Sequence, residues 1–275
     1  MNNESFCQHL VEHGYAILRR CISLDLIDQC KEAITFRLGQ MLEERDIKPN
    51  GDIYVDFLQA IERIAQPQVQ VELSKYLRYK EFQKRILLEP LVLEKLIVIL
   101  GPDLQCESSS ELAVNVTGVQ SGYLVKKYHQ EYWSGTGVNT LQTWNPLAIE
   151  PGMGSLEIIE ASHTWGHVPH RNREPIDIPS NAATTILDIE EGDMVFFHSL
   201  LLHQTVPNSH EFPRFGMPQL VRNFHHDETG FEDLKQWETF HFSPMSEIRK
   251  RLGNPHLSPF RIYDSERTEY FPRVT

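Results

Sequence analysis

Short apolar segments separated by glycine and proline fill the chain from residue 111 to residue 224, and they constrain the fold more than any other feature. The segments are rich in β-branched and aromatic residues. Their spacing, with no helical pattern between them, indicates an antiparallel sandwich or jelly roll rather than alternating βαβ units. The candidate strands are residues 111–117, 122–128, 138–147, 155–159, 183–188, 193–197, 200–206 and 214–224.

Apolar side chains recur at helical spacing through most of the first hundred residues. Ser23 is a suitable N-cap, because its hydroxyl can accept a hydrogen bond from a free N–H of the first helical turn. Pro90 cannot continue a helix, so it divides the last helical stretch. The sequence predicts a short strand at residues 14–18, followed by helices at residues 24–45, 53–65, 69–79 and 81–100.

The predicted helices supply a cover for the predicted strands. An open antiparallel sheet must bury one face, and the N-terminal helices are the elements available to cover it. We therefore expect a single domain over residues 1–275. Its parts are a mainly helical cover (1–101), a jelly-roll core (105–225) and a C-terminal extension (226–275).

Charge and composition exclude several classes of partner. The chain has 26 Lys and Arg residues against 38 Asp and Glu residues, a net charge of −12 that disfavours binding to nucleic acid or to an anionic membrane surface. It has no apolar run long enough to span a membrane and no secretory signal pattern. Its four cysteines form no C-x-x-C pair, which is typical of free thiols in a cytoplasmic protein.

A histidine and a carboxylate two residues apart are the clearest candidates for chemistry. His129 and Glu131 lie in a segment with strand character, where residues i and i+2 point to the same side of a sheet. His203, on a later strand, is the candidate third ligand. Two histidines and one carboxylate form the facial triad of non-haem Fe(II) oxygenases, which leaves coordination positions open. An isolated H-x-E pattern is common by chance, so the triad needs support elsewhere in the chain.

Arg214 and Thr205 provide that support. A dicarboxylate that chelates iron through one end must have its other carboxylate held by the protein. A guanidinium can hold it with two parallel hydrogen bonds, and a hydroxyl can add a third. Arg214 begins the strand after the one that carries Thr205, so hairpin pairing can bring the two side chains together.

Taken in chain order, these residues and several others resemble the phytanoyl-CoA dioxygenase family of Fe(II)- and 2-oxoglutarate-dependent oxygenases. The resemblance implies a double-stranded β-helix, a cupin-like jelly roll, under an N-terminal helical layer. It also implies Fe(II), 2-oxoglutarate and O2 as reactants. The family usually has Asp in place of Glu131, and its halogenating members have Ala or Gly there, so Glu131 argues against halogenation. The matching positions are residues 14–18, 129–131, 144–147, 154–156, 161–163 and 192–198, with His203, Thr205, Asn208 and Arg214.

The resemblance also implies a role for each matching side chain. The metal ligands and catalytic residues would be His129, Glu131 and His203, and the distal carboxylate of 2-oxoglutarate would bind Arg214 and Thr205. Trp144 would wall the cosubstrate pocket and Gln130 would hydrogen-bond near it, whereas His198 matches a position that binds no metal. The candidate substrate contacts are Tyr132, Trp133, His163 and His167, although core packing explains the first two aromatic residues equally well.

The sequence therefore predicts an iron- and 2-oxoglutarate-dependent dioxygenase that hydroxylates a C–H bond of a small organic molecule, in secondary metabolism, and releases succinate and CO2. Desaturation, cyclisation or epoxidation would use the same iron centre, 2-oxoglutarate and O2. The alternative is a cupin-like metal-binding isomerase or binding module without redox chemistry, which would not bind 2-oxoglutarate. The sequence defines neither the substrate nor the oligomeric state.

Overall fold

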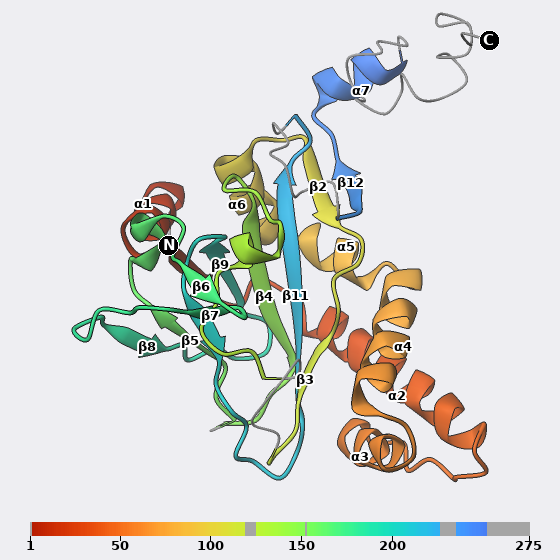
Figure 1. Ribbon diagram of the computed structural model, residues 1–275. Coiled ribbons are helices and arrows are strands. Elements are labelled where there is room, and N and C mark those ends of the chain that lie inside the picture. The colour runs from red at the N-terminus through yellow and green to blue at the C-terminus, as the bar shows by residue number, and fades with distance from the viewer. Residues whose placement is uncertain (1, 119–124, 152, 226–234, 252–275) are drawn as a thin grey trace, which may run out of the picture.

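The computed structural model describes residues 2–118, 125–151, 153–225 and 235–251, and it has a large antiparallel sheet at its centre (Figure 1). Six strands follow one another in the order β1-β9-β4-β11-β2-β12, and β3 also pairs with β11. The bounds are β1 Tyr15–Leu18, β2 Leu104–Glu107, β3 Ala113–Asn115, β4 Leu141–Ala148, β9 Met194–His198, β11 Arg214–Asn223 and β12 Trp237–His241.

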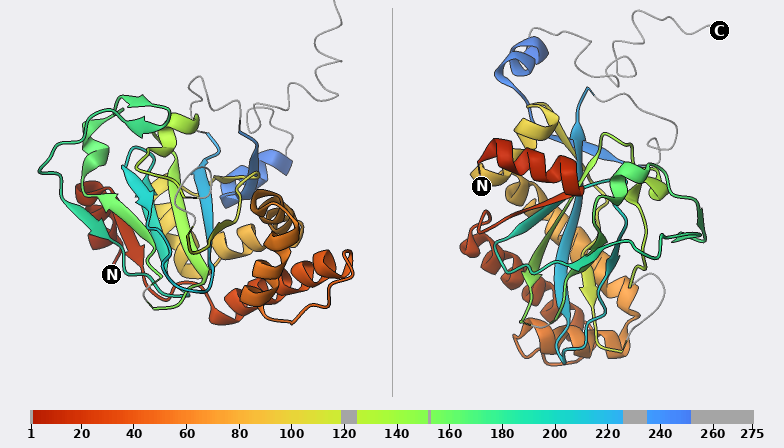
Figure 2. Two further views of the ribbon diagram at one scale, coloured as in Figure 1. Left: turned by 60° about the horizontal axis from the view of Figure 1, so that its bottom comes forward. Right: turned by 90° about the vertical axis from the view of Figure 1, so that its left-hand side faces the viewer.

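Helices cover one face of this large sheet (Figure 2). Apolar side chains of β4, β9 and β11 form one continuous core with those of the N-terminal helices, so that this face is shielded from water. The chain ends its described part with a further helix after β12. The helices are α1 Asn3–His13, α2 Leu24–Glu43, α3 Ile53–Arg63, α4 Gln66–Tyr79, α5 Phe82–Leu87, α6 Pro90–Leu100 and α7 Pro244–Arg251.

A smaller sheet faces the other side of the large one. Its order is β10-β5-β8, and its strands are β10 His203–Thr205, β5 Leu156–Ile159 and β8 Thr184–Ile186. A two-stranded ribbon of β6 (His170–Arg171) and β7 (Glu174–Pro175) lies beyond it. A second core joins the two sheets, with Trp144 and Phe197 from the large sheet and Leu156 and Ile158 from the small one. This arrangement confirms the predicted jelly roll under a helical layer.

Several predicted elements differ from the structure. The predicted strand at residues 122–128 lies partly outside the described residues, and its described part, residues 125–128, forms no strand. Strands β2 and β12 pair with each other and were not predicted, because each has only four or five residues, too few for an alternating pattern to be recognised. Strand β12 belongs to the predicted C-terminal extension, yet it forms one edge of the large sheet. Among the described residues, no helix has the length and apolarity that a membrane span requires.

Candidate metal centre

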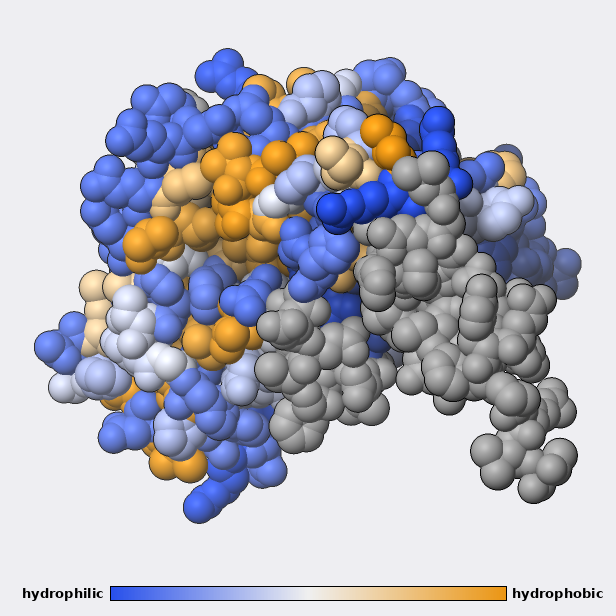
Figure 3. Space-filling model, turned by 90° about the horizontal axis from the view of Figure 1, so that it is seen from above, coloured by the Kyte–Doolittle hydropathy of each residue, from blue (hydrophilic) through white to orange (hydrophobic). Residues whose placement is uncertain are grey.

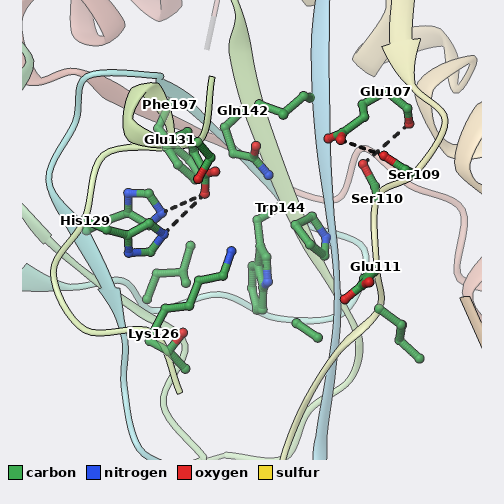
Figure 4. A pocket seen from close by; sticks show the side chains of 18 of the residues that line it. Glu107, Ser109, Ser110, Glu111, Lys126, His129, Glu131, Gln142, Trp144 and Phe197 are labelled. Atoms are coloured by element: carbon green, nitrogen blue, oxygen red, sulfur yellow. Dashed lines mark hydrogen bonds and ion pairs between the residues drawn. The ribbon is translucent and has the colours of Figure 1, made fainter. Parts of the chain in front are cut away.

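Two imidazoles and one carboxylate meet at the inner face of the small sheet. Glu131 Oε1 lies 3.3 Å from His129 Nε2 and 3.5 Å from His203 Nε2. Candidate ligand atoms from all three residues lie within 4.8 Å of one another, and each residue is buried. Figure 4 shows the carboxylate directed at the two rings. Three ligand atoms this close can hold one metal ion.

Backbone pairing, rather than a single strand, brings the three ligands together. His129 forms an isolated bridge with His203, the first residue of β10, with N–O distances of 2.9 and 3.1 Å. Glu131 is the first residue of a short 3-10 helix, Glu131–Ser134. The prediction that His129 and Glu131 project from one strand is therefore wrong in its local geometry. The bridge fixes the histidine, and the helical turn brings the carboxylate to the same point.

Hydrogen bonds to backbone carbonyls fix the orientation of both imidazoles. His129 Nδ1 lies 2.7 Å from the carbonyl oxygen of Lys127, and His203 Nδ1 lies 3.0 Å from that of Leu201. A carbonyl only accepts, so each Nδ1 carries the proton and each Nε2 presents a lone pair toward Glu131. His129 Nε2 is buried and makes no hydrogen bond with any residue that the structure describes. This is the tautomer and orientation that a metal-binding imidazole requires.

The electrostatics of the site favour a divalent cation. Burial, assisted by the neighbouring His203, lowers the pKa of His129 to about 4, so this imidazole is neutral at physiological pH. Burial alone would raise the pKa of Glu131, but its surroundings, with the positive charge of Lys126 as the largest contribution, lower it well below its usual value. A neutral imidazole beside an ionised carboxylate is the combination that binds a metal ion.

A cavity of about 270 Å³ opens beside the three ligands. Trp144 and Thr205, which the sequence predicted for the cosubstrate pocket, both line it. The Trp144 ring lies over Gly216, where an added Cβ would come within 2.5 Å of the ring. The opposite wall is polar and was not predicted. It includes Glu107, Ser109, Ser110, Glu111 and Lys235, whereas Gln142 lines the cavity beside Glu131.

Arg214 is buried behind this cavity rather than lining it. The side chain is 1% exposed. Nη1 donates to the carbonyl oxygen of Met153 (3.1 Å), and Nη2 donates to Asn115 Oδ1 (2.9 Å) and to the carbonyl oxygen of Val206 (3.2 Å). Nε is buried without a hydrogen-bond partner among the described residues. Burial lowers the pKa of Arg214 to about 10, so the guanidinium remains charged at neutral pH.

Gln130 faces away from the cavity, and this corrects the predicted contact with the cosubstrate. Its amide nitrogen donates to the carbonyl oxygens of Gly166 (2.8 Å) and Leu200 (2.6 Å), and its amide oxygen accepts from the backbone N–H of Val168 (3.0 Å). Both amide hydrogens are thereby used. Gln130 ties the ligand loop to two neighbouring segments, so its role is structural.

Replacing Gln130 with leucine is expected to lower the free energy of unfolding by about 3 kcal/mol, because three buried backbone groups lose their partners. Chemical denaturation of the metal-free protein measures this loss. Gln8→Leu, at an exposed position of α1, is the control and should change stability by less than about 0.5 kcal/mol. A Gln130→Leu protein as stable as the control would contradict the structural role.

The predicted substrate contacts lie outside the cavity wall. Trp133 stacks on His170, with ring centroids 4.4 Å apart, and Tyr132 packs near His167 at 5.4 Å. His163 borders a second cavity, of about 450 Å³, beside α1 and α6. Figure 3 shows apolar side chains gathered on that upper face of the molecule. None of the four side chains, which are Tyr132, Trp133, His163 and His167, lines the cavity beside the metal centre. Their contacts with a substrate stay predictions.

His198 also borders the second cavity and supplies a test of pH dependence. Burial, assisted by His163, lowers the pKa of His198 from 6.5 to about 4. Between these values the unfolded chain binds a proton that the folded chain does not, so stability falls as the pH is lowered. We expect His198→Asn to reduce this fall in metal-free protein, as measured by denaturation between pH 7 and pH 4. If the free energy of unfolding fell equally with pH in both proteins, the lowered pKa of His198 would be contradicted.

Comparisons with known proteins agree with the geometry. The model of the phytanoyl-CoA dioxygenase (PhyH) family matches residues 10–216. The apo non-heme monooxygenase ThoJ is 16% identical, with a TM-score of 0.62 over 95% of this chain and 99% of its own. EctD from S. alaskensis with 2-oxoglutarate and 5-hydroxyectoine is 16% identical, with a TM-score of 0.55 over 84% of this chain and 79% of its own.

A third solved structure is the epimerase SnoN in complex with Fe3+, alpha ketoglutarate and nogalamycin RO. It is 13% identical, with a TM-score of 0.51 over 81% of this chain and 84% of its own. At these identities the likeness shows a common fold. No curated protein sequence matches this chain. The family model spans most of the sequence, and it contains all three candidate ligands and Arg214. The chain belongs to the phytanoyl-CoA dioxygenase family of Fe(II)- and 2-oxoglutarate-dependent oxygenases.

Proposed function

We propose that this protein oxidises a C–H bond of a small polar molecule at an iron centre held by His129, Glu131 and His203. One observation carries the proposal: two oriented imidazoles and an ionised carboxylate converge at one end of a cavity. When bound there, Fe(II) would supply the activation of O2, coupled to conversion of 2-oxoglutarate to succinate and CO2. The protein would bind the substrate and the cosubstrate, orient them at the metal and keep water out of the cavity.

Arg214 and Thr205 are suited to hold the distal carboxylate of 2-oxoglutarate. Thr205 lines the cavity, and Arg214 offers a buried Nε–H without a partner among the described residues. A ligand oxygen at that nitrogen would satisfy a donor that is otherwise costly to bury. The positive charge of Arg214 is fixed by its three hydrogen bonds, so it attracts an anion without a large change of conformation.

The polar wall on the far side of the cavity is suited to the substrate. Glu107 is already paired with Lys235 at 3.1 Å, and both side chains are largely buried. Glu111 and Gln142 also face the cavity. Leu156, Phe197 and Trp144 supply apolar surface that limits the entry of water near the metal. A small molecule with hydroxyl or amino groups matches this wall better than a lipid chain.

The type of oxidation depends on where the substrate places its reacting carbon. The solved structures with this fold include a monooxygenase and an epimerase. Hydroxylation is our proposal, because epimerisation also needs a group that returns a hydrogen atom to the opposite face of the reacting carbon, and no tyrosine or cysteine is among the described residues that line the cavity. Product analysis by mass spectrometry would distinguish it, since hydroxylation adds one oxygen atom and epimerisation leaves the mass unchanged.

Thermal denaturation tests the proposed function before a substrate is known. Mn(II) should raise the melting temperature, and 2-oxoglutarate should raise it further only when Mn(II) is present. A metal-binding isomerase or binding module without redox chemistry predicts stabilisation by Mn(II) and no response to 2-oxoglutarate. That result would overturn the proposed oxygenase function.

A further inference from the structure

Glu111 carries a carboxylate that lines the cavity and has no partner among the residues that the structure describes. Figure 4 shows this side chain across the pocket from His129, with Trp144 between them, and no hydrogen bond or ion pair is drawn to it. The residue is half-buried. Taking a carboxylate partly out of water has a cost that a positively charged ligand offsets. This position in the cavity therefore favours a cation.

Alternation along an extended segment turns Glu111 toward the cavity. The side chains of Leu112, Val114 and Val116 belong to the core beneath the N-terminal helices. Successive residues of a strand point to opposite faces of the sheet, so Glu111 and Ala113 face the other way, where both line the cavity. Strand β3 lies in this segment and pairs with β11, which fixes the register.

Buried side chains of α4 and α5 fix the backbone on both sides of Glu111. Each of them is a polar residue whose hydrogen bond is made to the main chain of this segment. The bonds run from Gln83 Nε2 to the carbonyl oxygen of Ser110 (3.1 Å), from Gln70 Nε2 to that of Leu112 (3.0 Å), and from the backbone N–H of Leu112 to Ser74 Oγ (2.8 Å). The fold thus holds the segment in place before any ligand binds.

The other charged side chains on the cavity wall leave the polar wall with a negative charge. Glu107 is neutralised by Lys235, whose ammonium lies 3.1 Å from its carboxylate. Lys126 is exposed, and its charge acts at the metal centre, where it lowers the pKa of Glu131. Among the described residues, Glu111 therefore determines the sign of the charge that a substrate meets at the polar wall.

We propose that Glu111 binds a cationic nitrogen of the substrate, so that the molecule oxidised at the metal centre is a small amine or guanidine. The assignment rests on the proposed function. An ammonium or guanidinium would donate an N–H to this carboxylate, and a hydrogen bond between two charged groups is stronger than one between neutral groups. Because the backbone that carries Glu111 is already fixed, little conformational freedom is lost on binding. A neutral substrate of the same size would leave the carboxylate unpaired and bind more weakly.

Paramagnetic broadening by Mn(II) tests the proposal without turnover and without an identified substrate. Mn(II) at the three ligands broadens the NMR signals of any small molecule that enters the cavity, and titration gives its affinity. The probes are propylammonium and 1-propanol, which has the same size and no charge. In protein loaded with Mn(II) and 2-oxoglutarate at pH 7, propylammonium should bind about tenfold more tightly than 1-propanol.

Glu111→Gln should remove this preference, because it deletes the charge and keeps the shape of the side chain. The affinity for propylammonium should fall about tenfold, and the affinity for 1-propanol should not change. Glu62→Gln, at an exposed position of α3 that does not line the cavity, is the matched control and should leave both affinities unchanged. Thermal denaturation checks that both variants fold.

The outcomes separate this assignment from the proposed function. If 2-oxoglutarate fails to stabilise the Mn(II)-loaded protein, both are wrong. If 2-oxoglutarate does stabilise it and propylammonium binds no more tightly than 1-propanol, the function stands and the role of Glu111 is overturned. A preference for propylammonium that persists in Glu111→Gln also overturns that role, since another group then supplies the preference.

Discussion

Replacing His129 with alanine is expected to abolish both metal binding and turnover. The substitution removes one of three ligand atoms and leaves Glu131 with His203 alone. Loss of a partner that only orients a ligand already costs about 10- to 100-fold in metal affinity or activity, so loss of a ligand should weaken binding by more than about 100-fold. Calorimetry with Mn(II) measures the affinity, and succinate release measures the turnover.

The control for this variant is a half-buried imidazole outside the metal centre, His198. His198 borders the second cavity and is not among the clustered ligands. His198→Ala should therefore bind Mn(II) with unchanged affinity. Equal affinity of wild-type and His129→Ala proteins for Mn(II) would contradict the assignment of the metal centre.

Replacing Arg214 with alanine is expected to affect stability and cosubstrate binding together. Three buried oxygens, from Met153, Val206 and Asn115, would each lose a hydrogen bond from the guanidinium. We expect a loss of at least about 3 kcal/mol in the free energy of unfolding. The additional stabilisation by 2-oxoglutarate in the presence of Mn(II) should also disappear. Chemical and thermal denaturation measure these two effects.

A milder variant separates the binding role from the structural one. Thr205→Val keeps the volume of the side chain and removes the hydroxyl that lines the cavity. It should retain the fold and weaken binding of 2-oxoglutarate by about tenfold, the value of one hydrogen bond to a charged group. Unchanged affinity in Thr205→Val would place the distal carboxylate elsewhere in the cavity.

The sequence was sufficient to predict which three side chains the fold brings together, although not the way in which the chain presents them. The identities of His129, Glu131 and His203 followed from ligand chemistry and from the resemblance to the family. The local conformation did not follow, because the bridge at His129 and the 3-10 turn after it depend on contacts with a segment about 70 residues further along the chain. Periodicity in one segment carries no information about that pairing.

The same limit explains why the contacts of Gln130 and the polar wall of the cavity did not follow from the sequence. Gln130 lies between two ligands, yet its contacts are with Gly166, Val168 and Leu200, which only the folded chain brings near. The polar wall of the cavity depends on β2, a four-residue strand whose alternation is too short to recognise. Long, strongly periodic helices such as α2 were predicted to within two residues.

The most direct test of the metal centre is the anomalous scattering from a crystal grown with Mn(II). We expect a strong peak within bonding distance of His129 Nε2, His203 Nε2 and a carboxylate oxygen of Glu131. Mn(II) bound at another site, with no peak between these three side chains, would contradict it.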